Sequence, residues 1–224
     1  KIAGFAQNTG EGGFTPYHQE YGADIIFQIG TGYFGCRTEE GNFDPEKFQE
    51  IALHEVVKMI EIKISQGAKP GFGAILPAKK NTKEIAKFRD VEKGTEILSP
   101  PHHSAFGNDE EMISFIEKLR ELSNGKPIGI KLCVGQKDEF ERMVQTFAEK
   151  QNYPDFIAID GAEGGTGAAH MESLHWAGLA IVEAVHFAHS TLTKHKLRDE
   201  IKLMAAGKII SAFDIYRMLA LGAD

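Results

Sequence analysis

Cysteine is scarce in this sequence, whose 224 residues include only Cys36 and Cys133. The two cysteines form neither a CxxC pair nor a framework of disulfides. Because proteins of reducing compartments use cysteine in this sparing way, we expect a cytoplasmic protein.

Long apolar runs and an excess of positive charge are also missing. The most apolar stretch, 177–188, is interrupted by Glu183 and His186, so we expect neither a signal peptide nor a membrane partner. The net charge of −7 and the pI of about 5.7 argue against nucleic-acid partners. With 42% hydrophobic and 25% charged residues, the composition fits one globular domain, residues 1–224, with a substantial core.

Common catalytic signatures are absent. The sequence has no G-x-x-x-x-G-K-[ST] loop and no G-x-S-x-G turn, and no G-x-G-x-x-G stands early between a strand and a helix. His54-Glu55-Val-Val-Lys58 lacks the second histidine of a zinc site, and the other histidines show no ligand spacing. These absences exclude a P-loop, a nucleophile elbow and a Rossmann fingerprint, and we predict no metal site.

Glycine, in contrast, is abundant at 24 residues and gathers in loops. The apolar run 157–159 ends in Asp160, and four glycines follow within seven residues, at positions 161, 164, 165 and 167. This pattern is typical of a buried parallel strand that ends in a ligand site, because glycine lets main-chain N–H groups approach a ligand. A flexible surface loop is the alternative, but the same strand-then-loop pattern recurs along the chain and favours the ligand site.

Apolar runs alternate with amphipathic segments throughout the chain. We expect strands at 3–7, 25–29, 61–65, 97–98, 128–134, 156–160 and 201–206. We expect helices at about 45–60 and 176–193, and others capped by Asn108 with Glu111 at N3, by Asp138, and by Ser211 with Asp214 at N3. This alternation predicts a parallel sheet. Polar residues at the C-terminal strand ends favour a (β/α)8 barrel over a doubly wound sheet, because barrel active sites are built at that face.

Lys131 is the strongest single candidate for a functional residue. The apolar residues of its strand alternate onto one face, which would pack against helices, so Lys131 points into the barrel. An ammonium group there needs a partner or a ligand. A lysine that snorkels from an edge strand is the alternative.

Two further loops repeat the pattern. Gly207-Lys208 ends a strand and precedes a capped helix, where barrels commonly hold a phosphate, so we expect a phosphate-bearing cofactor. The segment 8–13 sets Glu11 among glycines, with a tight turn as the alternative.

Together these loops resemble the FMN-binding synthase domain of the glutamate synthase family over essentially the whole chain. The segments that carry the resemblance are 8–13, 66–71, Leu76-Pro77, 99–103, 130–132, 160–168 and 219–224. The resemblance implies an FMN (β/α)8 barrel in which Lys131 lies against the flavin ring and stabilises its anionic reduced form. Lys131 and Glu11 are the candidate catalytic residues. The residues implied to bind the cofactor are Asn8, Thr9, Gln28, Lys131, Asp160, Gly161, Gly164, Gly165 and Thr166, with Gly207 and Lys208 at the phosphate.

The family reaction delivers glutamine-derived ammonia to 2-oxoglutarate and reduces the resulting 2-iminoglutarate by hydride transfer from reduced FMN, which yields glutamate. The resemblance therefore implies an electron-donor protein or reductase subunit as a partner, together with a glutaminase domain or subunit.

The sequence departs from the family pattern in three ways. Family members usually read Lys-Pro-Gly-Glu-Gly-Gly in the third-strand loop, whereas this chain has Phe72 and Ala74. The family's 3Fe–4S cysteine cluster has no counterpart, so its ligands would lie outside this chain. The first and eighth family strands would also precede Lys1 and follow Asp224, so we expect a fragment. A barrel truly without them would leave two edges unpaired.

Two alternatives to glutamate synthesis follow from these departures. The lost carboxylate at position 72 leaves open an FMN barrel oxidoreductase that acts on another amino or imino compound. The missing strands leave open a non-catalytic barrel fragment that binds a partner.

Overall fold

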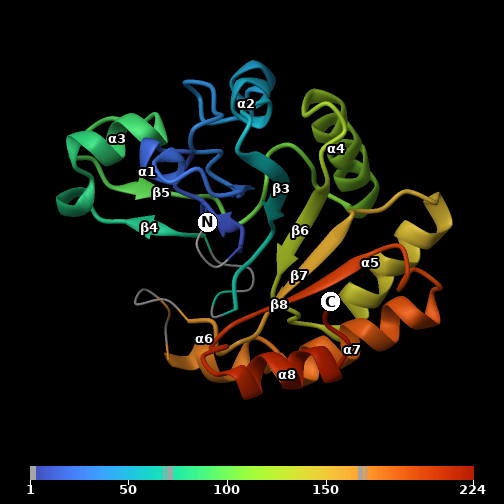
Figure 1. Ribbon diagram of the computed structural model, residues 1–224. Helices are drawn as coiled ribbons and strands as arrows, with labels where there is room; N and C mark the ends of the chain where they lie inside the picture. Colours follow the sequence, from blue (N-terminus) through green and yellow to red (C-terminus); the bar gives the residue numbers. More distant parts are fainter. Residues whose placement is uncertain (1–3, 68, 70–72, 166–168, 170) are drawn as a thin grey trace. The chain divides into compact units, whose positions relative to one another are not determined.

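The computed structural model describes residues 4–67, 69, 73–165, 169 and 171–224. The chain forms two compact units, and Figure 1 labels the helices and strands of both. The first unit comprises Lys1–Lys63 and Gly73–Ile128, and the second comprises Ile64–Phe72 and Gly129–Asp224. We describe each unit by itself.

The elements follow one another as strands and helices in alternation. Those of the first unit are β1 (Gln7–Asn8), α1 (Pro16–Gln19), β2 (Ile25–Ile29), α2 (Pro45–Ala52), β3 (Val57–Lys63), β4 (Ile75–Leu76), the 3-10 helix η1 (Ala78–Lys80), α3 (Lys83–Arg89), β5 (Ile97–Leu98) and α4 (Asp109–Leu122). Those that follow are β6 (Ile128–Leu132), α5 (Lys137–Lys150), β7 (Phe156–Asp160), α6 (Met171–Trp176), α7 (Ile181–Lys194), β8 (Lys202–Ala206) and α8 (Ala212–Ala220).

In the first unit β1, β2 and β3 pair in parallel, as predicted. One face of β2 and β3 is buried and apolar, and consists of Phe27, Ile29, Ile60 and Ile62. Phe27 stacks against Phe48 of α2, with 6.4 Å between ring centroids. Because side chains alternate along a strand, the opposite face carries Gln28, Glu61 and Lys63.

In the second unit β6, β7 and β8 also pair in parallel. Their buried apolar face consists of Ile130, Leu132, Ile157, Ile159 and Leu203. Figure 1 shows α7 alongside β7 and β8, with α5 next to α7. The opposite face carries Lys131 and Asp160. Gly129 lies on that face too, where a Cβ would stand 2.3 Å from the Phe156 ring, so the ring fills the space of the missing side chain.

The predicted strands 25–29 and 156–160 are confirmed at both ends, and β6 and β8 lie within their predicted ranges. The predicted caps Asn108 and Ser211 are also confirmed, since their side chains accept from the N–H groups of Glu111 and Asp214. Glu111 does not complete a capping box, because its carboxylate accepts from Gly107 N instead.

The helix predicted at 45–60 is wrong beyond Ala52. Asp44 caps α2, but the chain from Val57 onward is β3. The spacing of Val57 and Ile60 fits both periodicities, and pairing with β2 decides between them. The predicted strand 61–65 is thus the second half of β3, extended by two residues.

Two predicted strands differ in kind from the barrel strands we expected. β5 pairs antiparallel with β4 rather than joining a parallel sheet. The strand predicted at 3–7 begins only at Gln7, since Gly4 has φ +71, which is incompatible with an extended strand; Ala3 lies outside the described residues.

The helix predicted at 176–193 is divided into α6 and α7. Leu179 between them donates to Val134 O and accepts from Ala162 N, so the backbone bonds there leave the helix. Asp138 does not cap α5 either: the N-cap is Gln136, without a side-chain bond, and Asp138 stands in the first turn. Within the described residues, the helices are all too short or too polar to cross a bilayer.

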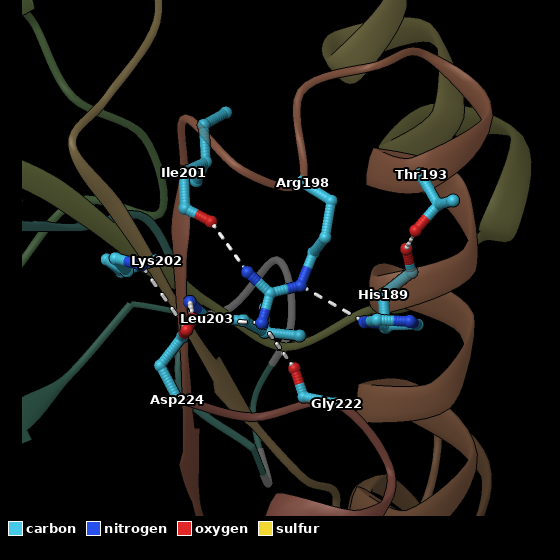
Figure 2. A network of polar contacts seen from close by, with 8 residues as sticks. All are labelled: His189, Thr193, Arg198, Ile201, Lys202, Leu203, Gly222 and Asp224. Carbon is cyan, nitrogen blue, oxygen red and sulfur yellow. Dashed lines mark hydrogen bonds and ion pairs between the residues drawn. The ribbon is translucent and has the colours of Figure 1, made fainter.

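Arg198 ties the end of the chain to β8 and α7 (Figure 2). Its guanidinium donates to His189 Nδ1 at 3.0 Å, to the carbonyls of Ile201 and Gly222 at 3.2 and 2.8 Å, and to Asp224 Oδ2 at 2.9 Å. Asp224 Oδ2 also accepts from Leu203 N at 2.7 Å. One side chain therefore satisfies acceptors on α7, before β8 and in the segment after α8.

Replacing Arg198 with methionine should destabilise the protein. The variant keeps most of the apolar stem but leaves two carbonyls and a carboxylate without their donor. We expect a loss of about 1–2 kcal/mol in the free energy of unfolding, near the lower end because Asp224 is partly exposed. Urea denaturation measures it. Arg217→Met is the control, since within the part of the chain that the structure describes the Arg217 side chain pairs with Asp214 alone, at i,i+3 and exposed. Equal effects of the two substitutions would contradict the role of Arg198.

Candidate functional site

Glu61 is the centre of a polar cluster on the first unit's sheet. Its carboxylate is buried, with 2% of the residue exposed. Glu61 Oε1 accepts from Gln28 Nε2 at 2.6 Å and from Asn8 Nδ2 at 2.8 Å. The register that aligns Gln28 with Glu61 brings these residues together. Two of the predicted cofactor-binding residues, Asn8 and Gln28, therefore meet at a carboxylate.

The loop after β1 is held to β2 by hydrogen bonds on both sides of Thr9. Thr9 N donates to Ile26 O at 3.0 Å, and Thr9 Oγ1 accepts from Gln28 N at 3.0 Å. Asn8 Oδ1 accepts from Gly10 N at 2.8 Å. Asn8 thus uses both ends of its amide within the protein, and Thr9 uses its hydroxyl to anchor the loop.

Glu11 forms an ion pair with Lys63 at the end of β3, with 2.9 Å between Oε2 and Nζ. The tight-turn interpretation also holds in part, because Gly10 and Gly13 have positive φ on either side. Gly30 makes room for the carboxylate, since a Cβ there would lie 2.7 Å from Glu11 Oε2. The loop therefore presents Glu11 as one half of an ion pair.

His103 contacts the last residue of β3 and the side chain of Tyr33 through its two ring nitrogens. Its Nε2 lies 2.9 Å from Lys63 O and its Nδ1 lies 3.0 Å from Tyr33 Oη. Tyr33 Oη also accepts from Ala105 N at 3.1 Å, so the tyrosine proton is directed to Nδ1 and the imidazole proton to Lys63 O. Burial lowers the pKa of His103 to about 4, which keeps the ring neutral as this arrangement requires.

In the second unit, Lys131 and Asp160, two of the predicted site residues, form an ion pair. Lys131 Nζ lies 3.4 Å from Asp160 Oδ2, and their side chains are 22% and 7% exposed. Lys131 aligns with Ala158 in the sheet, so Asp160 lies one pleat further along the same face. The ammonium is therefore paired, which is one of the two outcomes that the strand pattern predicted, and part of the side chain still reaches solvent.

The glycines after β7 allow the loop to pack against its own neighbours. A Cβ on Gly164 would lie 2.1 Å from Asp160 Oδ1, and one on Gly67 would lie 1.8 Å from Gly161 O. Gly161 N donates to Ala206 O at 2.9 Å and Gly164 N donates to Gly161 O at 2.8 Å. These two N–H groups have protein partners and do not act as free ligand donors. Gly165 is exposed, and Thr166 lies outside the described residues.

Glu163 anchors the same loop to a helix. Its carboxylate accepts from Ile181 N, with the shorter distance 2.9 Å, at the first residue of α7. Nearby, Cys133 is buried, and desolvation together with the charges of Asp160 and Glu163 raises its pKa to about 12. Cys133 is therefore a neutral thiol and is not a nucleophile at neutral pH.

Gly207 and Lys208 follow β8 with positive φ values of 113° and 47°, and Lys208 is exposed. The helix that follows is capped by its own side chains. Asp214 Oδ2 accepts from Ile210 N and Ser211 N, just before the first helical residue, and the Ser211 bonds hold the pKa of Asp214 below its usual value. This carboxylate takes two of the N–H groups in front of α8 that a phosphate at the helix start could otherwise use.

Sequence reasoning missed Glu61, Lys63 and Tyr33. The signal for the first two was present: Glu61 and Lys63 stand at alternate positions on either side of the buried Ile62, as in a strand with one polar face. Tyr33 carried no signal, because its partner His103 lies 70 residues away. Within the described ranges, no group of three or more His, Cys, Asp or Glu side chains could hold a metal ion.

Replacing His103 with glutamine should change how stability depends on pH. The folded protein lowers the histidine pKa from 6.5 to about 4, so the unfolded chain takes up a proton first as the pH falls. The stability that neutral His103 contributes is fully present above pH 6.5 and is lost between 6.5 and about 4. We expect the gap in unfolding free energy between wild type and His103→Gln to shrink by up to about 3 kcal/mol from pH 7 to 4.

Denaturant titrations at each pH measure this gap, and the exposed neighbour His102 provides the control variant His102→Gln. A gap that stays constant across the pH range would contradict a buried neutral His103.

A family model described as a conserved region in glutamate synthase matches residues 1–224. The glutamate synthase large subunit-like protein YerD of Bacillus subtilis is 43% identical over 97% of this chain and 41% of its own length. The archaeal glutamate synthase [NADPH] of Methanocaldococcus jannaschii is 32% identical over 100% of this chain and 41% of its own length. The chain thus spans about two fifths of these relatives.

Solved structures share the fold at low sequence identity. A flavocytochrome b2 double mutant with pyruvate bound has a TM-score of 0.56 and 16% identity, over 97% of this chain and 47% of that one. A flavocytochrome b2 mutant with benzoylformate has a TM-score of 0.55 and 14% identity, over 97% and 46%. These similarities and the parallel strands confirm the predicted fold class, part of a (β/α)8 barrel. The match of the family model over the whole sequence and the 43% identity to one relative lead to one conclusion: this chain belongs to the glutamate synthase family.

Proposed function

We propose that the chain is the flavin-binding part of an FMN-dependent oxidoreductase of glutamate synthase type. The reaction we propose for the whole protein is the reductive amination of 2-oxoglutarate to glutamate through 2-iminoglutarate. The observation that carries the proposal is the Lys131–Asp160 pair at the C-terminal ends of β6 and β7, in a chain of this family. We further propose that residues 1–224 act as one barrel domain.

The residues of the second unit fit the ring of a flavin. Bound FMN would supply two-electron hydride chemistry. Lys131 provides a fixed positive charge whose side chain remains partly exposed beside Asp160, as stabilisation of a negatively charged ring requires. Asp160 holds the ammonium in place, since the pair lies at 3.4 Å and the glycines around the carboxylate leave it no room to move.

Fewer groups are available to bind the FMN phosphate than the sequence pattern indicated. We propose that Gly207 and Lys208 hold the phosphate through an exposed ammonium and the backbone after β8, while Ile210 N and Ser211 N take no part because Asp214 already accepts from them. Gly165 and Thr166 remain proposed cofactor contacts.

In the first unit, we propose that Gln28 and Glu11 contribute polar groups to cofactor or substrate, and that Asn8 and Thr9 act mainly by holding their loop.

The names of several relatives specify NADPH, so we propose that electrons reach this protein from NADPH through a reductase subunit or domain. The ammonia source would be a glutaminase domain or subunit.

A second candidate keeps the flavin and changes the substrate to another amino or imino compound. It is favoured by Phe72, which replaces the usual family carboxylate and which lies outside the described residues. Turnover of 2-oxoglutarate with ammonia, compared with turnover of other 2-oxo acids, separates the two.

Replacing Lys131 with methionine tests the proposed role directly. The full-length protein should be yellow with bound FMN, and the variant should retain flavin while its reduction becomes less favourable. We expect glutamate formation to fall by about 10²- to 10³-fold, because a preorganised charge near developing negative charge is lost. Absorbance spectra, a redox titration and steady-state rates measure the three effects.

The matched control is Lys137→Met, since Lys137 forms an exposed pair with Glu183 at the start of α5. A colourless full-length protein that does not take up FMN would refute the proposed cofactor. Unchanged rates and potential in Lys131→Met would refute the role of the lysine.

A further inference from the structure

Glu61 is a buried anion whose contacts are with amides rather than with a cation. Only 2% of the residue is exposed, and the described part of the chain gives it no ion pair. Burying a carboxylate is costly unless hydrogen bonds compensate it. The two amide donors, at 2.6 and 2.8 Å, both bond to Oε1 and compensate that oxygen, so the three side chains form one unit.

The charge of Glu61 determines how the Gln28 amide is turned. An ionised carboxylate only accepts hydrogen bonds, so Gln28 must present its Nε2 at 2.6 Å. The reverse orientation would bring the amide oxygen against a carboxylate oxygen. Gln28 is itself only 4% exposed and its backbone N–H is bound to Thr9 Oγ1, so the side chain has little freedom.

The orientation leaves Gln28 Oε1 as a hydrogen-bond acceptor. Among the described residues, no protein group donates to this oxygen. The corresponding oxygen of Asn8, Oδ1, accepts from Gly10 N. Of the two amides bound to Glu61, only that of Gln28 therefore keeps its oxygen for a ligand.

We propose that Glu61 is a positioning residue that fixes Gln28 so that its Oε1 accepts a hydrogen bond from an N–H group of the bound ligand. The inference rests on the proposed function, which supplies two ligands with such a group. The oxidised flavin ring has one N–H, at the imide nitrogen N3, and an amino or imino substrate carries N–H on the reacting nitrogen. Both sources share the chemistry that Gln28 would recognise.

The role predicts that Glu61 matters only through Gln28. Glu61→Gln keeps the size of the side chain but removes the charge, so the amide of residue 28 can take either orientation. We expect the affinity for the ligand that donates the N–H to fall about tenfold. In a Gln28→Leu background, Glu61→Gln should have no further effect on that affinity, because its target is gone.

Two measurements on the full-length protein identify the source of the N–H group. The first compares the dissociation constants of FMN and of FMN methylated at N3, which lacks the N–H. If the flavin donates, wild type should prefer FMN, and Glu61→Gln should reduce this preference about tenfold. If the substrate donates, flavin affinity should stay unchanged and the KM for ammonia should rise about tenfold, with kcat less affected.

Controls separate this role from a structural one. Glu50→Gln changes an exposed glutamate on α2 and should alter neither quantity. Should Glu61→Gln fail to fold, Gln28→Leu alone must still lower the preference for FMN or raise the KM. The proposal is overturned if all variants keep both values, or if Glu61→Gln acts equally with and without Gln28. A protein without flavin or glutamate formation would instead refute the proposed function.

Discussion

Both polar clusters, Lys131 with Asp160 and Glu61 with its two amides, result from burying a charged side chain on one face of a parallel sheet. A buried charge needs partners, and the two units provide them in different ways. Lys131 meets an anion one strand away, since the register brings Asp160 onto the same face at 3.4 Å. Glu61 meets two amides, since the register aligns it with Gln28. The first arrangement leaves a cation that still reaches solvent, and the second leaves an oriented acceptor. Both are groups that a polar ligand can use.

Glycines around the buried charge of Asp160 allow backbone segments to approach one another, because they carry no side chain. Around Asp160, the segments after β3, β7 and β8 approach so closely that a Cβ on Gly67 or Gly164 would lie within 2.1 Å of Gly161 O or Asp160 Oδ1. The carboxylate is therefore enclosed by main chain rather than by movable side chains. The N–H groups of Gly161 and Gly164 bind the protein itself rather than remaining free for a ligand. These glycines contribute by their small size instead, because Gly164 leaves the space that the carboxylate of Asp160, the partner of Lys131, occupies.

The parts of the fold that could be predicted are those encoded by local spacing. Alternation along residues 128–134 placed Lys131 on the polar face, and the acid at the end of an apolar run placed Asp160. The helix wrongly extended to residue 60 shows the limit, because Val57 and Ile60 fit either period until pairing with β2 selects the strand. The role of Glu61 could not be predicted for the same reason. It depends on the strand register, which brings Glu61 beside Gln28, a residue 33 positions away in the sequence. Tyr33, held at φ +48 with its hydroxyl bound to His103, depends on a partner even further along the chain.

The first unit's polar face also narrows the chemistry of what it binds. Asn8 uses its amide on Glu61 and Gly10, and Lys63 pairs with Glu11. Among the described residues, no protein group donates to Gln28 Oε1 or to Glu61 Oε2, so both oxygens remain available as acceptors. An acceptor favours ligands that carry N–H, which includes 2-iminoglutarate and every other amino or imino compound. Under the proposed function, this face selects for an amino or imino nitrogen and does not choose among such compounds. We propose that the choice depends on positions 72 and 74, where Phe72 and Ala74 replace the usual family residues. Because Ala74 O accepts from Ser99 N at 2.8 Å and Gly73 leaves no space for a Cβ beside Ser99 O, residues 73 and 74 lie against the segment that leads to His103.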